Sequence, residues 1–139
     1  MISLATARAL KRAGLAWTPA QHDFFAFPEH GLDDRVVVLA EMPAGLAQLQ
    51  GEAVFTFHGA MEWALDYIFT ADAVWLPTEA QLRQAVEGRL PGPRFSLTAT
   101  PDGYTLALET DQGPLTFTAT SAEETYAAAL LALLSRAPP

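Results

Sequence analysis

The chain has 139 residues, of which 50% are hydrophobic and 17% charged, and this composition is typical of a folded globular domain rather than a disordered segment. Its net charge of -8 disfavours a nucleic-acid ligand, because binding to a phosphate backbone depends on basic side chains. The absence of cysteine excludes disulfides, thiolate zinc ligands and a cysteine nucleophile. No stretch reaches the roughly 18 apolar residues of a membrane span. We therefore expect a cytoplasmic protein with protein partners.

The first part of the chain predicts one helix and two strands. Residues 2–14 are rich in alanine and leucine and favour a helix that stops at Gly14. Residues 24–27 form a short aromatic strand between two prolines. Asp33 and Asp34 fit a turn, and the unbroken apolar run that follows them, Val36 to Leu39, predicts a strand covered on both faces.

Residues 43–76 predict alternating helices and strands. Pro43 is suited to the first position of a short helix through Leu49, and residues 52–59 read as a strand. In residues 60–69, Trp63 and Tyr67 are four apart, which favours a second short helix. Residues 74–76 then form a brief extended piece.

The second half has stronger local signals. Thr78 and Gln81 have the spacing of a capping box, and Leu82, Ala85, Val86 and Leu90 would form the apolar stripe of the helix that follows. Three runs alternate apolar and polar residues in the manner of half-buried strands: 95–100, 104–109 and 115–118. Tight turns containing glycine separate these runs, so we expect an antiparallel three-stranded sheet.

The last strand passes directly into the last helix. Ser121 and Glu124 have the spacing of a second capping box, which would end the strand and begin the helix. One apolar stripe follows, formed by Ala127, Leu130, Leu131 and Leu134. The fold class we expect is α+β with two lobes in one compact domain. Residues 1–76 form a helix and a small aromatic-rich sheet, and residues 77–139 form an α-β-β-β-α lobe.

Two resemblances follow from these patterns. The order of elements in residues 78–136 resembles the double-stranded-RNA-binding domain in topology only. RNA-binding members have a lysine-rich start to the final helix, whereas this chain has Ser121-Ala122-Glu123-Glu124-Thr125 there. The stretches "GLAWTP…DFF", "EWALDYI…VWLPTEAQL" and "FTATSAEETYAAALLALL" together resemble a group of short uncharacterised proteins from bacterial and phage genomes. That second resemblance implies a fold and assigns no activity or site residue.

The candidates for chemistry are few. The three histidines are His22, His30 and His58; His22 precedes Asp23, and His58 is four residues before Glu62. Neither pair completes a known ligand set, so we assign no metal residues and no cofactor. The carboxylate pairs Asp33-Asp34 and Asp66/Asp72 are typical of solvated turns. Lys11 is the single lysine, and no nucleophile elbow or phosphate-binding glycine loop occurs. We therefore assign no catalytic residues.

Aromatic residues are concentrated in residues 17–75. They are Trp17, Phe24, Phe25, Phe27, Phe55, Phe57, Trp63, Tyr67, Phe69 and Trp75. They predict either a core or an exposed groove for a peptide or a second subunit.

We expect a non-enzymatic, acidic protein-interaction module that binds another protein or forms a homodimer. One alternative is a small hydrolase that uses His22, His58 and nearby carboxylates. Another is an acidic nucleic-acid mimic or immunity-type inhibitor, suggested by charge alone.

Overall fold

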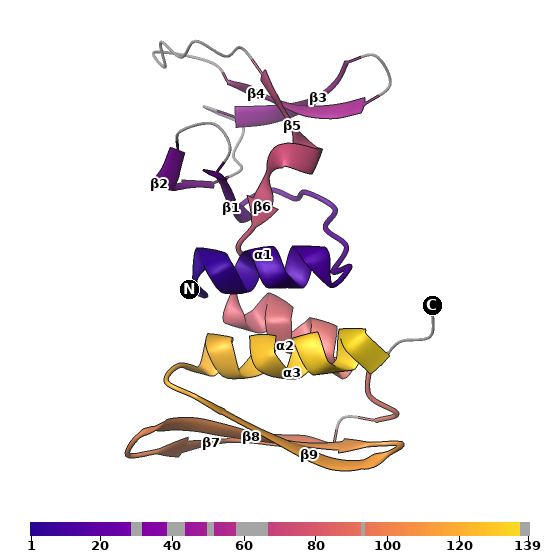
Figure 1. The fold of residues 1–139 in the computed structure, drawn as a ribbon. Coiled ribbons are helices and arrows are strands. Elements are labelled where there is room, and N and C mark those ends of the chain that lie inside the picture. The colour runs from indigo at the N-terminus through magenta and orange to yellow at the C-terminus, as the bar shows by residue number, and fades with distance from the viewer. Residues whose placement is uncertain (29–31, 39–43, 50–51, 58–66, 93, 137–139) are drawn as a thin grey trace. The chain divides into compact units, whose positions relative to one another are not determined.

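The computed structural model describes residues 1–28, 32–38, 44–49, 52–57, 67–92 and 94–136 (Figure 1). The chain divides into two units. The helical unit consists of Met1–Ala16 and Pro77–Pro139, and the strand unit consists of Trp17–Leu76. As expected from the sequence, the fold class is α+β with antiparallel sheets. None of the helices in the described ranges is both long enough and apolar enough to span a bilayer.

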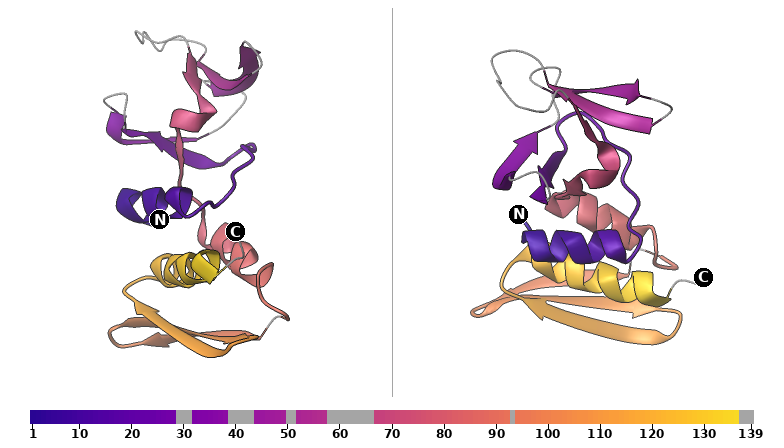
Figure 2. Two further views of the ribbon diagram at one scale, coloured as in Figure 1. Left: turned by 45° about the vertical axis from the view of Figure 1, so that its right-hand side comes forward. Right: turned by 45° about the horizontal axis from the view of Figure 1, so that its top comes forward.

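The helical unit contains three helices and one sheet. Its elements are α1 (Leu4–Arg12), α2 (Glu79–Glu87), β7 (Phe95–Thr100), β8 (Gly103–Thr110), β9 (Gly113–Ala119) and α3 (Ala122–Arg136). The sheet is antiparallel with β8 in the centre, in the order β7-β8-β9. Helices α2 and α3 lie side by side over one face of the sheet, and α1 packs on α3 from the opposite side (Figures 1 and 2).

Helix α2 begins as its sequence predicts. The Thr78 side chain accepts a hydrogen bond from the Gln81 N–H, and the Gln81 carboxamide accepts one from the Thr78 N–H. This reciprocal pair satisfies two backbone donors at the helix start. Leu82 and Val86 are fully buried, whereas Ala85 is half-buried. Leu90 lies beyond the end of the helix and is also half-buried. The buried stripe of α2 is therefore narrower than the sequence predicts.

Helix α3 is buried over a wider arc than one apolar stripe. Ala127 and Leu130 are fully buried as predicted, but Leu131 and Leu134 are only half-buried. Thr125 and Tyr126 are buried instead. The reason is that α3 contacts α2, α1 and the strands β8 and β9, so more than one of its sides is covered.

The predicted grouping of helix α1 with residues up to 76 differs from the structure. Its buried residues Ala7 and Leu10 belong to the helical unit, in which α1 packs on α3. The helix ends near Gly14, whose backbone has φ +96°. This is the left-handed conformation that glycine adopts at helix ends.

The described residues of the strand unit form two small antiparallel sheets. Its elements are β1 (Phe24–Phe27), β2 (Leu32–Val38), β3 (Ala44–Leu49), β4 (Glu52–Phe57), β5 (Tyr67–Phe69), the 3₁₀ turn η2 (Thr70–Asp72) and β6 (Val74–Trp75). One sheet has the order β2-β1-β6 and the other β3-β4-β5. The strands expected at 24–27, 52–59 and 74–76 are present as β1, β4 and β6, although β6 ends at Trp75 and residues 58–59 lie outside the described ranges.

Three predictions in this unit are wrong. Residues 44–49 form strand β3 rather than a helix, because each of them pairs with a residue of β4 in a regular hairpin. Tyr67–Phe69 form strand β5, which pairs with β4; the rest of the predicted helix at 60–69 lies outside the described residues. Asp33 and Asp34 lie within β2 rather than in a turn, and Val36 is 47% exposed, so β2 is not covered on both faces.

Candidate functional site

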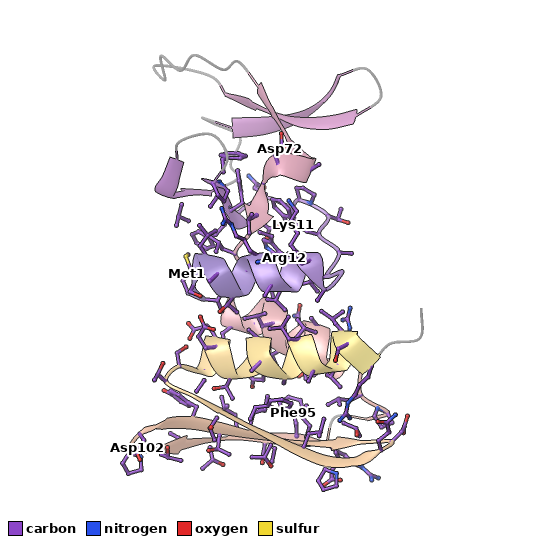
Figure 3. The ribbon with its side chains drawn as sticks, viewed as in Figure 1. Met1, Lys11, Arg12, Asp72, Phe95 and Asp102 are labelled. Carbon is purple, nitrogen blue, oxygen red and sulfur yellow. The ribbon has the colours of Figure 1, made fainter. Side chains whose placement is uncertain are left out.

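The sheet of the helical unit has one covered face and one open face. Leu106 and Leu108 of β8 are buried on the covered face, where the Phe95 ring meets the Tyr126 ring edge-on at 6.2 Å. Figure 3 shows the Phe95 side chain on the helix side of the sheet. Burial raises the pKa of the Tyr126 hydroxyl, with Glu79 of α2 adding to the shift. This face forms the core of the unit.

The open face consists of small polar side chains. The register places Thr98, Thr105 and Thr118 in one row across the three strands, and Ser96, Ala107 and Thr116 in the next row. All of them are exposed except Thr105, which is half-exposed. This arrangement is the polar face expected from the alternation of apolar and polar residues in the three strands. Threonine suits an exposed strand, so the face alone does not indicate a ligand.

The edge strand β7 is the most informative part of this surface. The Glu109 N–H donates to the Arg94 carbonyl at 2.9 Å, which makes Arg94 and Glu109 a hydrogen-bonded pair at the start of the ladder. Because such pairs alternate along an antiparallel ladder, Ser96, Thr98 and Thr100 direct their backbone groups toward β8. The N–H and C=O groups of Phe95, Leu97 and Ala99 therefore point away from the sheet. Among the described residues, β8 is the one strand paired with β7.

Strand β7 lacks the features that usually protect a sheet edge. Its sequence, FSLTAT, contains no charged residue and no proline, and its register with β8 is regular over all six residues. Natural edge strands are commonly protected by charge, proline or a bulge. The other edge, β9, has Pro114 among its outward-facing residues, so one donor is missing there. The less protected edge of the unit is therefore β7.

A pocket of about 310 Å³ opens beside the β8–β9 hairpin. Its lining consists of Arg89, Pro91, Thr110, Asp111, Gln112, Leu133 and Arg136. The Arg89 guanidinium donates to the Ala85 carbonyl at 3.0 Å, and Arg136 lies in the last turn of α3. Cations in these positions stabilise the negative ends of helices. The Thr110 hydroxyl donates to the Gly113 carbonyl at 2.7 Å. Both arginines and this hydroxyl thus have structural roles.

The corner between β9 and α3 is structural, and one of its contacts was not expected. The Ser121 hydroxyl accepts a hydrogen bond from the Glu124 N–H at 3.1 Å, so the hydroxyl half of the predicted capping box is confirmed, whereas the Glu124 carboxylate bonds to another helix. The Glu124 carboxylate accepts from the Ser3 N–H at 2.7 Å and from the Thr6 hydroxyl at 2.8 Å. Glu124 therefore supplies the carboxylate of a capping box to α1, a different helix.

Glu123 is also engaged at this corner. Its carboxylate lies 3.2 Å from the Met1 ammonium nitrogen. A hydrogen bond to the Glu123 backbone, supported by this ammonium group, lowers the pKa of the Glu123 carboxyl. The place where the RNA-binding resemblance would require lysines thus carries two glutamates, both of which contact the start of the chain.

The predicted histidine chemistry receives no support from the described residues. His22 is exposed and has φ 73°, a backbone conformation uncommon for a residue other than glycine. Its neighbour Asp23 is 5% exposed and accepts hydrogen bonds from the Trp17 indole at 2.8 Å and the Ala20 N–H at 2.9 Å, so Asp23 orders a loop. No three metal-ligating side chains cluster within the described ranges.

The other candidates for chemistry are four residues beyond the described ranges and one exposed carboxylate. His30, His58, Glu62 and Asp66 lie outside the described residues, while Asp72 is an exposed residue of η2.

The aromatic cluster behaves as a core where its side chains are described. Phe25 and Phe27 are fully buried and meet edge-on at 5.1 Å. The Trp17 and Trp75 rings are stacked at 6.0 Å with an angle of 4° between them. The Trp75 indole nitrogen is buried and has no hydrogen-bond partner in the described part of the chain. Phe25 and Phe27 are therefore core residues, and the half-buried Trp17 ring packs against the Phe25 ring with their centroids 5.7 Å apart.

No protein-family model, curated protein or solved structure matches the chain. Both resemblances noted in the sequence therefore remain predictions, and the function must be inferred from the geometry.

Proposed function

We propose that the protein is a non-enzymatic interaction module that binds an extended segment of another protein, or of a second copy, along the free edge of β7. The observation that supports this proposal is the outward-facing, unprotected row of backbone groups at Phe95, Leu97 and Ala99. An extended segment laid beside β7 would pair with these groups and continue the sheet, a common mode of peptide recognition.

The side chains of β7 support the same mode of binding. Leu97 is half-buried and Ala99 is exposed on the helix side of the sheet, so an added strand would cover apolar surface there. On the other side, Ser96 and Thr98 offer hydroxyl groups. A partner segment is therefore expected to alternate apolar and small polar residues, as β7 itself does.

For a partner other than a second copy, the net charge of -8 favours a basic or neutral protein. A cytoplasmic location is part of the proposal, because a chain without cysteine has no need of an oxidising compartment. No nucleic acid is expected to bind at about 0.15 M salt, where exposed charges still act over roughly 8 Å. A micromolar gel shift with duplex RNA that weakens steeply with salt would contradict this expectation.

The experiment uses two matched proline variants. Ala99→Pro removes an outward N–H from β7, and Thr118→Pro removes an outward N–H from β9, so neither breaks a bond to the central strand. The immobilised chain is used to capture partners from an extract of its native cells. Binding should be lost with Ala99→Pro and retained with Thr118→Pro, with circular dichroism confirming that both variants fold. Equal capture by both variants would refute binding at β7.

A further inference from the structure

The backbone groups and side chains of the β7 edge complement those of the same edge in a second copy of the chain. This self-complementarity favours a second copy as the partner. We propose that β7 pairs with β7 of a second copy in an antiparallel register centred on Leu97, so that two three-stranded sheets join into one. This inference rests on the proposed function, because it requires the β7 edge to accept a strand. It goes further because it identifies the added strand as β7 of a second copy.

The backbone groups determine the register. Phe95, Leu97 and Ala99 each carry an outward C=O and an outward N–H. If Leu97 faces Leu97 of the second copy, Phe95 faces the second copy's Ala99, and all of these groups are paired. A shift of two residues in either direction leaves one of the three outward-facing residues opposite a position beyond the end of the second copy's β7, without a strand partner. The centred register is therefore the one in which all three residues pair fully.

The side chains fit the same register. Directly opposite residues lie on the same face of a sheet, so Leu97 would contact its own copy on the helix side. The large Phe95 would lie opposite the small, exposed Ala99 of the second copy. On the open face, Ser96 would lie opposite the second copy's Thr98, which places two hydroxyl groups together. No charged side chain is brought into the paired segment.

The charges at the two ends of β7 also favour antiparallel pairing. Arg94 precedes the strand and Asp102 follows it in the β7–β8 hairpin, and both are exposed. Figure 3 shows Asp102 at the tip of this hairpin. In the centred register Arg94 faces the second copy's Thr100, and Asp102 lies in the turn just beyond Thr100, where the long Arg94 side chain can reach it. Symmetry produces this opposite-charge contact twice, whereas parallel pairing would place like charges together.

Within one copy the two charges are too far apart to interact. Thr100 is six residues beyond Arg94, and an extended strand rises about 3.3 Å per residue, so the hairpin turn that contains Asp102 begins on the order of 20 Å from Arg94. That distance exceeds the screening length of roughly 8 Å at physiological salt. Any energetic coupling between the two positions must therefore arise between copies.

The test is a charge reversal with a built-in rescue. Sedimentation equilibrium across a concentration series should show the mass of the full chain rising from 15.0 kDa toward twice that value. Arg94→Asp and Asp102→Arg should each weaken self-association about tenfold, since each turns two attractive contacts into two repulsive ones. The double variant restores opposite charges and should return to within about threefold of the wild type.

Two results would overturn the inference. One is a wild-type chain that stays at 15.0 kDa at every concentration. The other is a double variant no better than the single variants, although circular dichroism shows it folded. Capture of another protein that Ala99→Pro abolishes, together with a monomeric chain, would refute self-pairing and leave the proposed function intact. A monomeric chain and capture insensitive to Ala99→Pro would refute both.

Discussion

The contact between Glu124 and helix α1 makes a quantitative prediction about stability. Helix α1 has no acidic residue in its own first turn, and the Glu124 carboxylate takes that place from α3. It accepts one hydrogen bond from the Ser3 N–H and one from the Thr6 hydroxyl. The change Glu124→Ala removes both bonds and the negative charge beside the positive end of α1.

The magnitude follows from the exposure of the two bonds. A hydrogen bond to a charged group contributes about 1.5–3 kcal/mol when it is shielded from water. The bond to the Ser3 N–H is exposed, so water can replace the carboxylate, and its loss should cost about 0.5–1 kcal/mol. The bond from Thr6 is partly buried and should be worth about 1–1.5 kcal/mol. Glu124→Ala should therefore lower the free energy of unfolding by about 2 kcal/mol.

Urea denaturation followed by circular dichroism measures this change as a lower transition midpoint at an unchanged slope. Amide hydrogen exchange shows where the stability is lost, because the amides of α1 should lose more protection from exchange than those of β8. Glu79→Ala is the matched control. Glu79 is also a first-turn glutamate, it is exposed, and its effect should stay within about 0.5 kcal/mol.

A double-mutant cycle isolates the partly buried bond. Glu124→Gln and Thr6→Val each disturb it, and their combined effect should fall short of the sum of the single effects by about 1 kcal/mol. Additive effects, or a Glu124→Ala variant as stable as the wild type, would show that Glu124 does not cap α1.

Four further predictions concern the same unit. Leu130→Ala should cost about 2–5 kcal/mol in a denaturant melt, because Leu130 is fully buried on α3; a silent change would contradict the assigned helix face. Ser121→Ala should cost about 1 kcal/mol through the loss of the α3 cap, again by denaturation. Gly103→Ala should be strongly destabilising, since Gly103 has φ +146° and a Cβ would clash with the Ala119 carbonyl; normal expression and an unchanged melting temperature would refute this. Folding lowers the pKa of the Glu123 carboxyl from 4.5, so the ionised carboxylate stabilises the folded protein above pH 4.5. This stabilisation is lost as the pH falls through the lower pKa of the folded state. The difference in unfolding free energy between wild type and Glu123→Gln should therefore shrink in acid.

The sequence determined most of the local structure of residues 77–136. The capping residues Thr78 and Ser121 mark the starts of α2 and α3; the full capping box forms at Thr78, and at Ser121 the hydroxyl bond forms while the Glu124 carboxylate bonds to α1. Alternation assigned the two faces of the sheet correctly, because a strand turns each successive side chain to the opposite face. These are short-range effects, in which the decisive partners are a few residues apart.

Tertiary structure decided what depends on distant partners. Residues 44–49 have a pattern that fits a helix, yet pairing with β4 makes them a strand. Helix α1 joins the second half of the chain because Glu124, 121 residues beyond Ser3, caps it. The proposed binding edge follows the same rule. The sequence shows that FSLTAT is a strand without charge, but only its place at the sheet edge, with β8 on one side, leaves the backbone groups of Phe95, Leu97 and Ala99 facing outward.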